Sequence, residues 1–482
     1  MCDRWQARAA LVWVALLAAL NYLAGIGEPH HPVWDESYYL TSIQRYQDGT
    51  AQFASHPPLG LMLLAAGEAL WQDNRNLDTT ALGRDKQVPG DRLPESFSFT
   101  GERVASGVFA VAGAVAFFAL MLALTRHVLA AALLANLYVF ENAFIVQFRA
   151  AQLDAFLVFF VICALWCLVV RVSNRGRGSG ILDFTFGVAC GLAAMVKLNA
   201  GVLALSGVMV VLWDARQRLV TAARAGAIML TGGFLAVIAV LSLHVALAPH
   251  PPDATSSAGQ KDGRFVSATY SDYLLGKRPF SPTVVLAAAR DYGHFVSADF
   301  TGMSRSDPNS SNALQWPLHY KTINYRWDAR AGETSYVQLT GNLFGWWVAL
   351  IAPLAAAGLL ILRKLRPCAT TPPERRVLLT LLLVQYLAIM ALHLWLGTQR
   401  VMYLYHYFMG LVVAFCLVPL AWQEAADRLP GLRGRVEPLM AGGTLLLLAS
   451  FAFYAPLTFH RPLTHTQCER RNLFQHVVDC RQ

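Results

Sequence analysis

The chain has 482 residues, of which 55% are hydrophobic and 14% are charged, whereas an ordinary soluble domain carries roughly 25% charged residues. This balance excludes a soluble enzyme and predicts a polytopic membrane protein. The formal net charge is +9, but most arginines lie in short gaps between apolar runs, as in cytoplasmic loops. The basic balance therefore does not indicate nucleic-acid binding.

Apolar segments long enough to cross a bilayer recur along the whole chain. A spanning helix needs about 20 mostly apolar residues. The sequence contains eleven candidates, at residues 9–25, 102–124, 128–147, 153–171, 181–198, 200–214, 225–247, 342–362, 377–397, 401–421 and 437–456. The first follows Arg4 and Arg8, which predicts a cytoplasmic N-terminus. It could be a cleaved signal peptide, but it fits the alternation of loops as a retained span.

Alternation from that start places fourteen basic residues on the cytoplasmic side, as the positive-inside rule requires. They are Arg126, Arg171, Arg175, Arg177, Arg216, Arg218, Arg363, Lys364, Arg366, Arg375, Arg376, Arg428, Arg433 and Arg435. The same alternation predicts three parts. Residues 1–247 form a first set of spans with an outside loop at 26–101, residues 248–340 form a large outside loop, and residues 341–482 form the last spans and an outside tail.

Two short helices are predicted in the first outside loop. One runs to about Asp48 with Tyr39, Ile43 and Tyr46 on one face, which suits a helix lying in the membrane interface. The other begins at Pro58 and is too short to span. The large loop has weak periodicity, and we expect only one helix in it, at about residues 284–295.

Adjacent carboxylates begin the first of these helices. Asp35 and Glu36 are neighbours, so on a helix they point about 100° apart and cannot both address one atom. One is therefore a candidate general base, and the other would hold structure or substrate. Asp35 could also be only the N-cap of the helix, a role that does not exclude catalysis.

His56 lies in the same loop, before two prolines that hold its backbone extended. It could orient a carboxylate or a sugar, bind a metal together with Glu36, or be a plain interface histidine. His30 and His31 lie upstream, but at no recognised ligand spacing, so the sequence gives a metal site little support.

Further polar residues interrupt the apolar runs at their predicted outer ends. Arg149 and Asp154 bracket a short hinge, where they could form a buried ion pair that ties two helices together. Lys197 ends an apolar run two residues before Asn199. Lys197 could simply extend its charge to the interface, or it could face a phosphate.

The segment before the tenth span contains Arg400 and His406. On a helix these two would lie about 120° and 9 Å apart, and Arg400 could hold a phosphate oxygen. Trp316 in the large loop could stack on a sugar ring or cover a core. Glu141, inside a span, is expected to pair with Arg103 or another basic group.

Taken in order, the motifs WDES, HPPLG, GERVASG, ENAFIVQFRAAQLD, GLAAMVKLNAG, QWPL and RVMYLYHY resemble the protein O-mannosyltransferase and aminoarabinose-transferase superfamily. The resemblance covers about residues 34–410. It implies a GT-C fold, an all-α membrane architecture with interfacial helices in the first loop, and a polyprenyl-phosphate sugar donor. The 248–340 loop is too short and unpatterned for the β-trefoil insertion of eukaryotic members, so the chain resembles the compact bacterial form.

The resemblance also implies roles for individual residues. Asp35 would be the catalytic base, and Glu36 and His56 would help to place the acceptor. Donor binding and architecture would fall to Arg149, Asp154, Lys197 and Arg400, and we add Asn199, Trp316 and His406 as further substrate-binding candidates.

The expected function is that of an inverting glycosyltransferase of the bacterial inner membrane. It would move a sugar, with mannose favoured, from a polyprenyl-phosphate donor to a protein serine or threonine hydroxyl. The alternatives are lipid A or another glycan as acceptor or, from a different class, a transporter or flippase. No cofactor is required, although a divalent metal stays open. Cys468 and Cys480, close together in the tail, could pair if that tail faces an oxidising compartment.

Overall fold

The computed structural model describes residues 2–88, 90–174, 179–216, 218–302, 304–365, 372–473, 478 and 480. Among these residues, ten helices are long and apolar enough to cross a membrane, and a bent pair of shorter helices raises the number to eleven if it counts as one span. The prediction of a helical membrane protein with about eleven spans is confirmed. Arg175, Arg177 and Arg366, which the sequence placed on the cytoplasmic side, lie outside the described residues.

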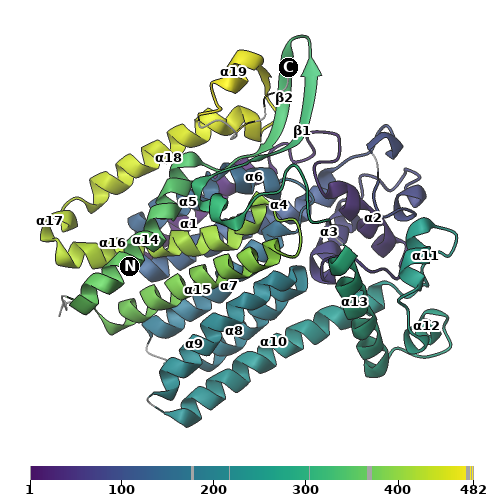
Figure 1. The fold of residues 1–482 in the computed structure, drawn as a ribbon, viewed down its shortest axis with the longest axis horizontal. Helices are drawn as coiled ribbons and strands as arrows, with labels where there is room; N and C mark the ends of the chain where they lie inside the picture. The colour runs from purple at the N-terminus through teal and green to yellow at the C-terminus, as the bar shows by residue number, and fades with distance from the viewer. Residues whose placement is uncertain are drawn as a thin grey trace.

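The spanning helices follow the predicted apolar runs closely. They are α1 (Cys2–Leu23), α4 (Thr100–Thr125), α7 (Asp154–Ser173), α8 (Ser179–Val196), α9 (Ala204–Ala215) preceded by the helical turn η3 (Leu198–Leu203), α10 (Leu219–Leu247), α14 (Leu343–Leu365), α15 (Pro373–Gly397), α16 (Phe408–Arg428) preceded by the turn η5 (Leu404–Tyr407), and α18 (Val436–Thr458). Figure 1 shows many of these helices lying side by side along the long axis of the molecule.

The predicted span at residues 128–147 is broken in the structure. It consists of α5 (Val128–Val139) and α6 (Asn142–Phe148), which are bent by 59°. Glu141 stands at the break and is fully buried. One of its carboxylate oxygens accepts hydrogen bonds from the backbone nitrogens of Ala143 and Asn342 and from the Trp346 indole. The expected pairing of Glu141 with Arg103 is therefore wrong, because Glu141 anchors the bend to α14.

The loops outside the spans gather mainly at one end of the helix bundle (Figure 1). They contain α2 (Glu36–Gln47), α3 (Pro58–Trp71), the turns η1 (Thr80–Gly83) and η2 (Gly90–Arg92), α11 (Ser257–Gly263), α12 (Ala268–Leu274), α13 (Pro282–Gly302) and the turn η4 (Ala313–Leu318). The opposite end carries α17 (Pro430–Arg433).

Helix α2 lies outside the spanning helices, and the surrounding loops cover most of it. Ten of its twelve residues are buried. The hydroxyl of Tyr46 lies 2.7 Å from Nδ1 of His244 on α10. Long-range packing by segments far along the chain therefore covers a helix whose own sequence suggests a surface position.

A small antiparallel sheet was not predicted. Strands β1 (Ile323–Arg330) and β2 (Glu333–Leu339) form a hairpin, and β3 (Pro462–Thr464) pairs with β2. After β3, α19 (His465–Glu469) leads into a tail in which Cys468 and Cys480 form a disulfide. The pairing that the sequence left open is thus present.

One apolar core joins both ends of the chain. It extends from Val14 to Leu447 and includes residues of α4, α7, α15 and α16. The early and late transmembrane helices therefore pack together, which places residues 35 and 400 within reach of one cavity. The division into residues 1–247, 248–340 and 341–482 stays a prediction.

Candidate active site

A cavity of about 420 Å³ lies among the loops at one end of the bundle. Three segments far apart in the sequence line it: residues 35–61 with Lys86, residues 261–299, and residues 400–406. Of the predicted site residues, four line this cavity: Asp35, His56, Arg400 and His406. The cavity therefore brings together one carboxylate, two histidine rings and one guanidinium from distant parts of the chain.

Asp35 precedes α2 as its N-cap residue, but its side chain makes no capping hydrogen bond. The purely structural alternative considered for this residue is therefore not realised, and the carboxylate lines the cavity instead. Burial raises the pKa of Asp35 to about 6, and the negative charge of Asp154 adds to this effect, while the positive charges of Lys197 and Arg400 oppose it. Such a carboxylate can accept a proton near neutral pH.

Trp34, directly before Asp35, has a left-handed backbone with φ of +53°. That conformation is strained for a bulky residue, and it persists only where the surroundings enforce it. The Trp34 ring stacks on Tyr325 of β1 with centroids 4.9 Å apart, and its edge meets Tyr403 at 5.5 Å. The β1–β2 hairpin and the 400–406 segment thus hold Trp34 in place by ring contacts, and Trp34 in turn fixes the position of Asp35. No local pattern in the sequence predicts these contacts.

Glu36 is fully buried and is not among the residues that line the cavity. Its two oxygens accept hydrogen bonds of 2.8 Å each from Nε and Nη2 of Arg103. They also accept from the backbone nitrogens of Val33 and Ala151. The prediction that Glu36 touches substrate is not supported by this geometry, since its acceptor sites are used to tie the first loop to α4 and to the hinge.

The hinge residues do not form the predicted ion pair with each other. Asp154 instead accepts from Nζ of Lys197 at 2.7 Å and from the amide of Gln147 at 2.6 Å. Gln147 in turn accepts from the Tyr325 hydroxyl. A buried chain of polar contacts therefore runs from Lys197 to the residue on which Trp34 stacks.

Lys197 is 5% exposed and does not line the cavity. Its ammonium lies 5.1 Å from the ring centroid of Tyr405, and Tyr405 is a lining residue. Lys197 is therefore separated from the cavity by the Tyr405 ring, and its positive charge affects the pKa of Asp35 without contact. Its contact with a donor phosphate stays a prediction.

Arg149 lies away from the cavity and caps a helix. Its guanidinium donates to the carbonyl oxygens of Asn21, Ala24 and Gly25 at 2.7–3.1 Å. Cationic side chains at a helix C-terminus satisfy its last carbonyls in this way. Its position supports the architectural part of its expected role and not direct donor binding.

Residues 401–403, between Arg400 and the turn η5 that contains His406, are not helical, so the helical spacing assumed for the pair is wrong. Within the described residues, the only hydrogen bond of the Arg400 guanidinium is a weak one of 3.5 Å, donated by Nε to the carbonyl oxygen of Val401, which leaves the guanidinium available to an anion. Nδ1 of His406 is engaged with the Tyr403 backbone, and its ring stacks on Tyr405 with centroids 4.6 Å apart.

Two further candidates lie behind the cavity wall. Trp316 is 0% exposed, donates to the Ser311 hydroxyl and stacks on His406. It supports His406 and offers no open face to a sugar. Asn199 lies 3.0 Å from Nε2 of His393, so it too belongs to the supporting layer.

The far side of the cavity was missed by sequence reasoning. Asp262 of α11 is buried and binds both Arg45 of α2 and Lys86, at 2.8 and 2.6 Å. Nearby, Ser55 donates to Asp299 of α13 at 2.6 Å. These contacts dock the large loop onto the first loop and complete the cavity. The residues involved are spread over more than 200 positions, so no motif joins them.

His56 lines the cavity with its backbone held by Tyr292, whose hydroxyl donates to its carbonyl at 2.6 Å. Burial, with the charges of Lys197 and Arg400, holds the pKa of His56 well below its usual range. A metal shared by His56 and Glu36 does not fit, because Arg103 and two backbone amides occupy the Glu36 oxygens. In the described part of the chain, no group of three or more His, Cys, Asp or Glu residues is arranged to hold a metal ion.

Comparisons with known proteins identify the family of the chain. Residues 12–250 match the family described as dolichyl-phosphate-mannose-protein mannosyltransferase, and residues 296–477 match the C-terminal four TMM region of protein-O-mannosyltransferase. The chain is 24% identical over 400 residues to a polyprenol-phosphate-mannose–protein mannosyltransferase of Mycolicibacterium smegmatis, covering 72% of this chain and 71% of that protein. It is 27% identical over 169 residues to protein O-mannosyl-transferase 2 of Danio rerio, covering 34% of this chain and only 21% of that protein.

The fold has a solved counterpart. The S. cerevisiae protein O-mannosyltransferase Pmt1-Pmt2 complex bound to the sugar donor contains a chain that superimposes with a TM-score of 0.78. The match covers 98% of this chain and 92% of that one at 13% sequence identity. The likeness therefore shows a shared fold.

Proposed function

The chain belongs to the protein O-mannosyltransferase family, and we propose that it transfers mannose from a polyprenyl-phosphate donor to a serine or threonine hydroxyl of a protein. The observation that carries this proposal is the pairing in one cavity of Asp35, whose carboxylate is not used for capping, with Arg400, whose guanidinium forms no ion pair among the described residues. Base and anion-binding group are the two functions that this transfer needs.

The proposed reaction is a single displacement with inversion. The acceptor hydroxyl oxygen attacks C1 of the sugar while the Asp35 carboxylate takes the hydroxyl proton. The bond between C1 and the phosphate oxygen breaks, and polyprenyl phosphate leaves with both electrons of that bond. Arg400 stabilises the charge that grows on the leaving phosphate. No step uses a metal.

The neighbouring residues support these two groups. Trp34 orients Asp35 through its stacking on Tyr325, and the Lys197–Asp154 pair lies behind the wall where its charges act on Asp35. Neutral His56 can donate or accept a hydrogen bond without adding a second cation beside the base. Preorganised charges of this kind stabilise a transition state because they need no rearrangement during reaction.

Within the membrane, we place the cavity on the periplasmic face of the bacterial inner membrane and the N-terminus in the cytoplasm. The ends of α14, α16 and α17 that carry basic residues lie at the end of the bundle opposite α2 and α11 (Figure 1). The positive-inside rule assigns that basic end to the cytoplasm. Donor lipid and acceptor would then meet on the outer side.

The test is transfer by the purified, detergent-solubilised chain from polyprenyl-phosphate mannose, offered a serine- and threonine-rich peptide or lipid A. We expect mannosylated peptide. Asp35→Asn should lower turnover by about 10² to 10⁴-fold, the usual contribution of a general base. The matched control is Asp78→Asn, because Asp78 is exposed in the same loop and, among the residues that the structure describes, hydrogen-bonds only to Thr80.

Two results would contradict the proposal. Transfer to lipid A but not to peptide would assign the alternative acceptor. Movement of donor across vesicles without transfer in either assay would indicate a flippase.

A further inference from the structure

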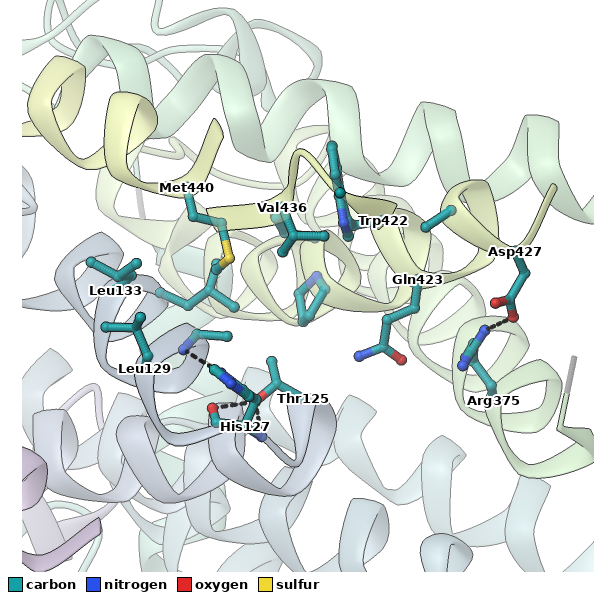
Figure 2. Close-up of a pocket in the computed structure, with 16 residues that line it drawn as sticks. Thr125, His127, Leu129, Leu133, Arg375, Trp422, Gln423, Asp427, Val436 and Met440 are labelled. Carbon is teal, nitrogen blue, oxygen red and sulfur yellow. Dashed lines mark hydrogen bonds and ion pairs between the residues drawn. The ribbon is translucent and has the colours of Figure 1, made fainter. Parts of the chain in front are cut away.

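A second cavity, of about 650 Å³, lies at the end of the bundle away from the catalytic cavity. It is formed where the turn between α4 and α5, the start of α15, the end of α16 and the start of α18 meet (Figure 2). None of the predicted catalytic or substrate residues lines it. Its size falls within the range of roughly 300–1,000 Å³ typical of small-molecule sites.

One part of this cavity is polar. Gln423, His127 and the ion pair between Arg375 and Asp427 line it (Figure 2). The indole nitrogen of Trp422 is buried and has no hydrogen-bond partner among the described residues. An unsatisfied buried donor is costly, and a ligand oxygen at this position would remove that cost.

The other part is apolar and continues as a groove. An adjoining hollow of about 250 Å³ shares six lining residues with the cavity and extends to Phe344 of α14 and Leu447 of α18. From Val436 to Leu447 the groove follows twelve residues of α18, a rise of about 16 Å at 1.5 Å per residue. This is close to half of the roughly 30 Å hydrocarbon core of a bilayer.

The charge at the polar part favours an anion. Asp427 balances the charge of Arg375, but the exposed residues Arg126 and Arg435 directly precede the lining residues His127 and Val436. The mouth therefore carries an excess of positive charge. Basic pockets between transmembrane helices commonly take lipid head groups.

We propose that this cavity binds an anionic phospholipid from the leaflet opposite the catalytic cavity. One acyl chain would lie in the groove between α5, α14 and α18, and the phosphate would accept from the Trp422 indole near Arg375. A groove as deep as one leaflet suits an acyl chain and not a polyprenyl chain, which extends further. This site is separate from the proposed transfer reaction.

Native mass spectrometry of the purified full-length chain tests the proposal, with dioleoyl phosphatidylglycerol compared with dioleoyl phosphatidylcholine. Gly443 lines the groove, and a side chain added there would point toward the Phe344 ring, 3.7 Å from the Cβ position. Gly443→Leu should fill the groove and weaken phosphatidylglycerol binding by about tenfold, the effect of losing roughly 1.4 kcal/mol.

The matched control is Gly442→Leu, because a Cβ at Gly442 meets nothing within 4 Å. Both substitutions replace glycine within one helix and favour helix formation, so both variants should fold. Trp422→Phe keeps the ring and removes the donor to the phosphate, which both lipids carry, so it should weaken binding of both lipids and leave the preference for phosphatidylglycerol unchanged.

Three outcomes would overturn the proposal. These are equal binding of the two lipids by the wild-type chain, equal loss of binding in Gly442→Leu and Gly443→Leu, and loss of a dimer in Gly443→Leu with lipid binding unchanged. The last result would assign the groove to a second copy of the chain.

Discussion

Lowering the pH should reduce the transfer activity, and the pH at which activity falls should report the pKa of Asp35. Its pKa of about 6 compares with about 3.9 for an unperturbed aspartate. At a pKa of about 6, roughly 90% of the carboxylate is ionised at pH 7 and roughly 10% at pH 5, so kcat/KM should fall about tenfold between them. An unperturbed aspartate would lose less than about a tenth of its activity over the same range.

The assay is steady-state transfer to peptide between pH 4.5 and 8, with samples returned from pH 5 to pH 7 to show that the fold survives. His56 does not titrate in this range because its pKa is held well below the ordinary value. Arg400→Gln should move the acidic limb to higher pH, since the Arg400 charge lowers the pKa of Asp35. A flat profile from pH 5 to pH 7 would refute the assignment of Asp35 as the base.

Two further predictions separate contact with the donor from support of the fold. Arg400→Gln should raise KM for the lipid donor by about tenfold or more, because charge-assisted hydrogen bonds contribute about 1.5–3 kcal/mol. The control is Arg264→Gln, since Arg264 is exposed. If Arg400→Gln leaves KM as unchanged as the control does, Arg400 does not contact the phosphate. Lys197→Met should lower the free energy of unfolding by about 3–5 kcal/mol, because it leaves the Asp154 carboxylate buried without its cation. Adding Asp154→Asn should restore much of this loss in a denaturation experiment, and failure of that rescue would show that the pair is not structural.

The sequence by itself determined the membrane class and the approximate position of the spans, and it singled out the candidate residues of the proposed site. Apolar runs of about 20 residues leave a polypeptide little choice but to cross a bilayer as helices. The acid at residue 35 and the basic residue at 400 are conspicuous because charge is costly beside membrane spans. These features are local, and a local pattern is enough to reveal them.

Only the tertiary structure decided which partner each polar residue takes. Glu36 is bound by Arg103, 67 positions away, and Lys197 by Asp154, 43 positions away. Arg45 meets Asp262 across 217 positions. Asp35 and Glu36 look equivalent in the sequence, yet Asp35 lines a cavity, whereas Glu36 is buried in an ion pair with Arg103. The difference arises because burial and pairing depend on how distant helices pack, which no spacing along the chain encodes.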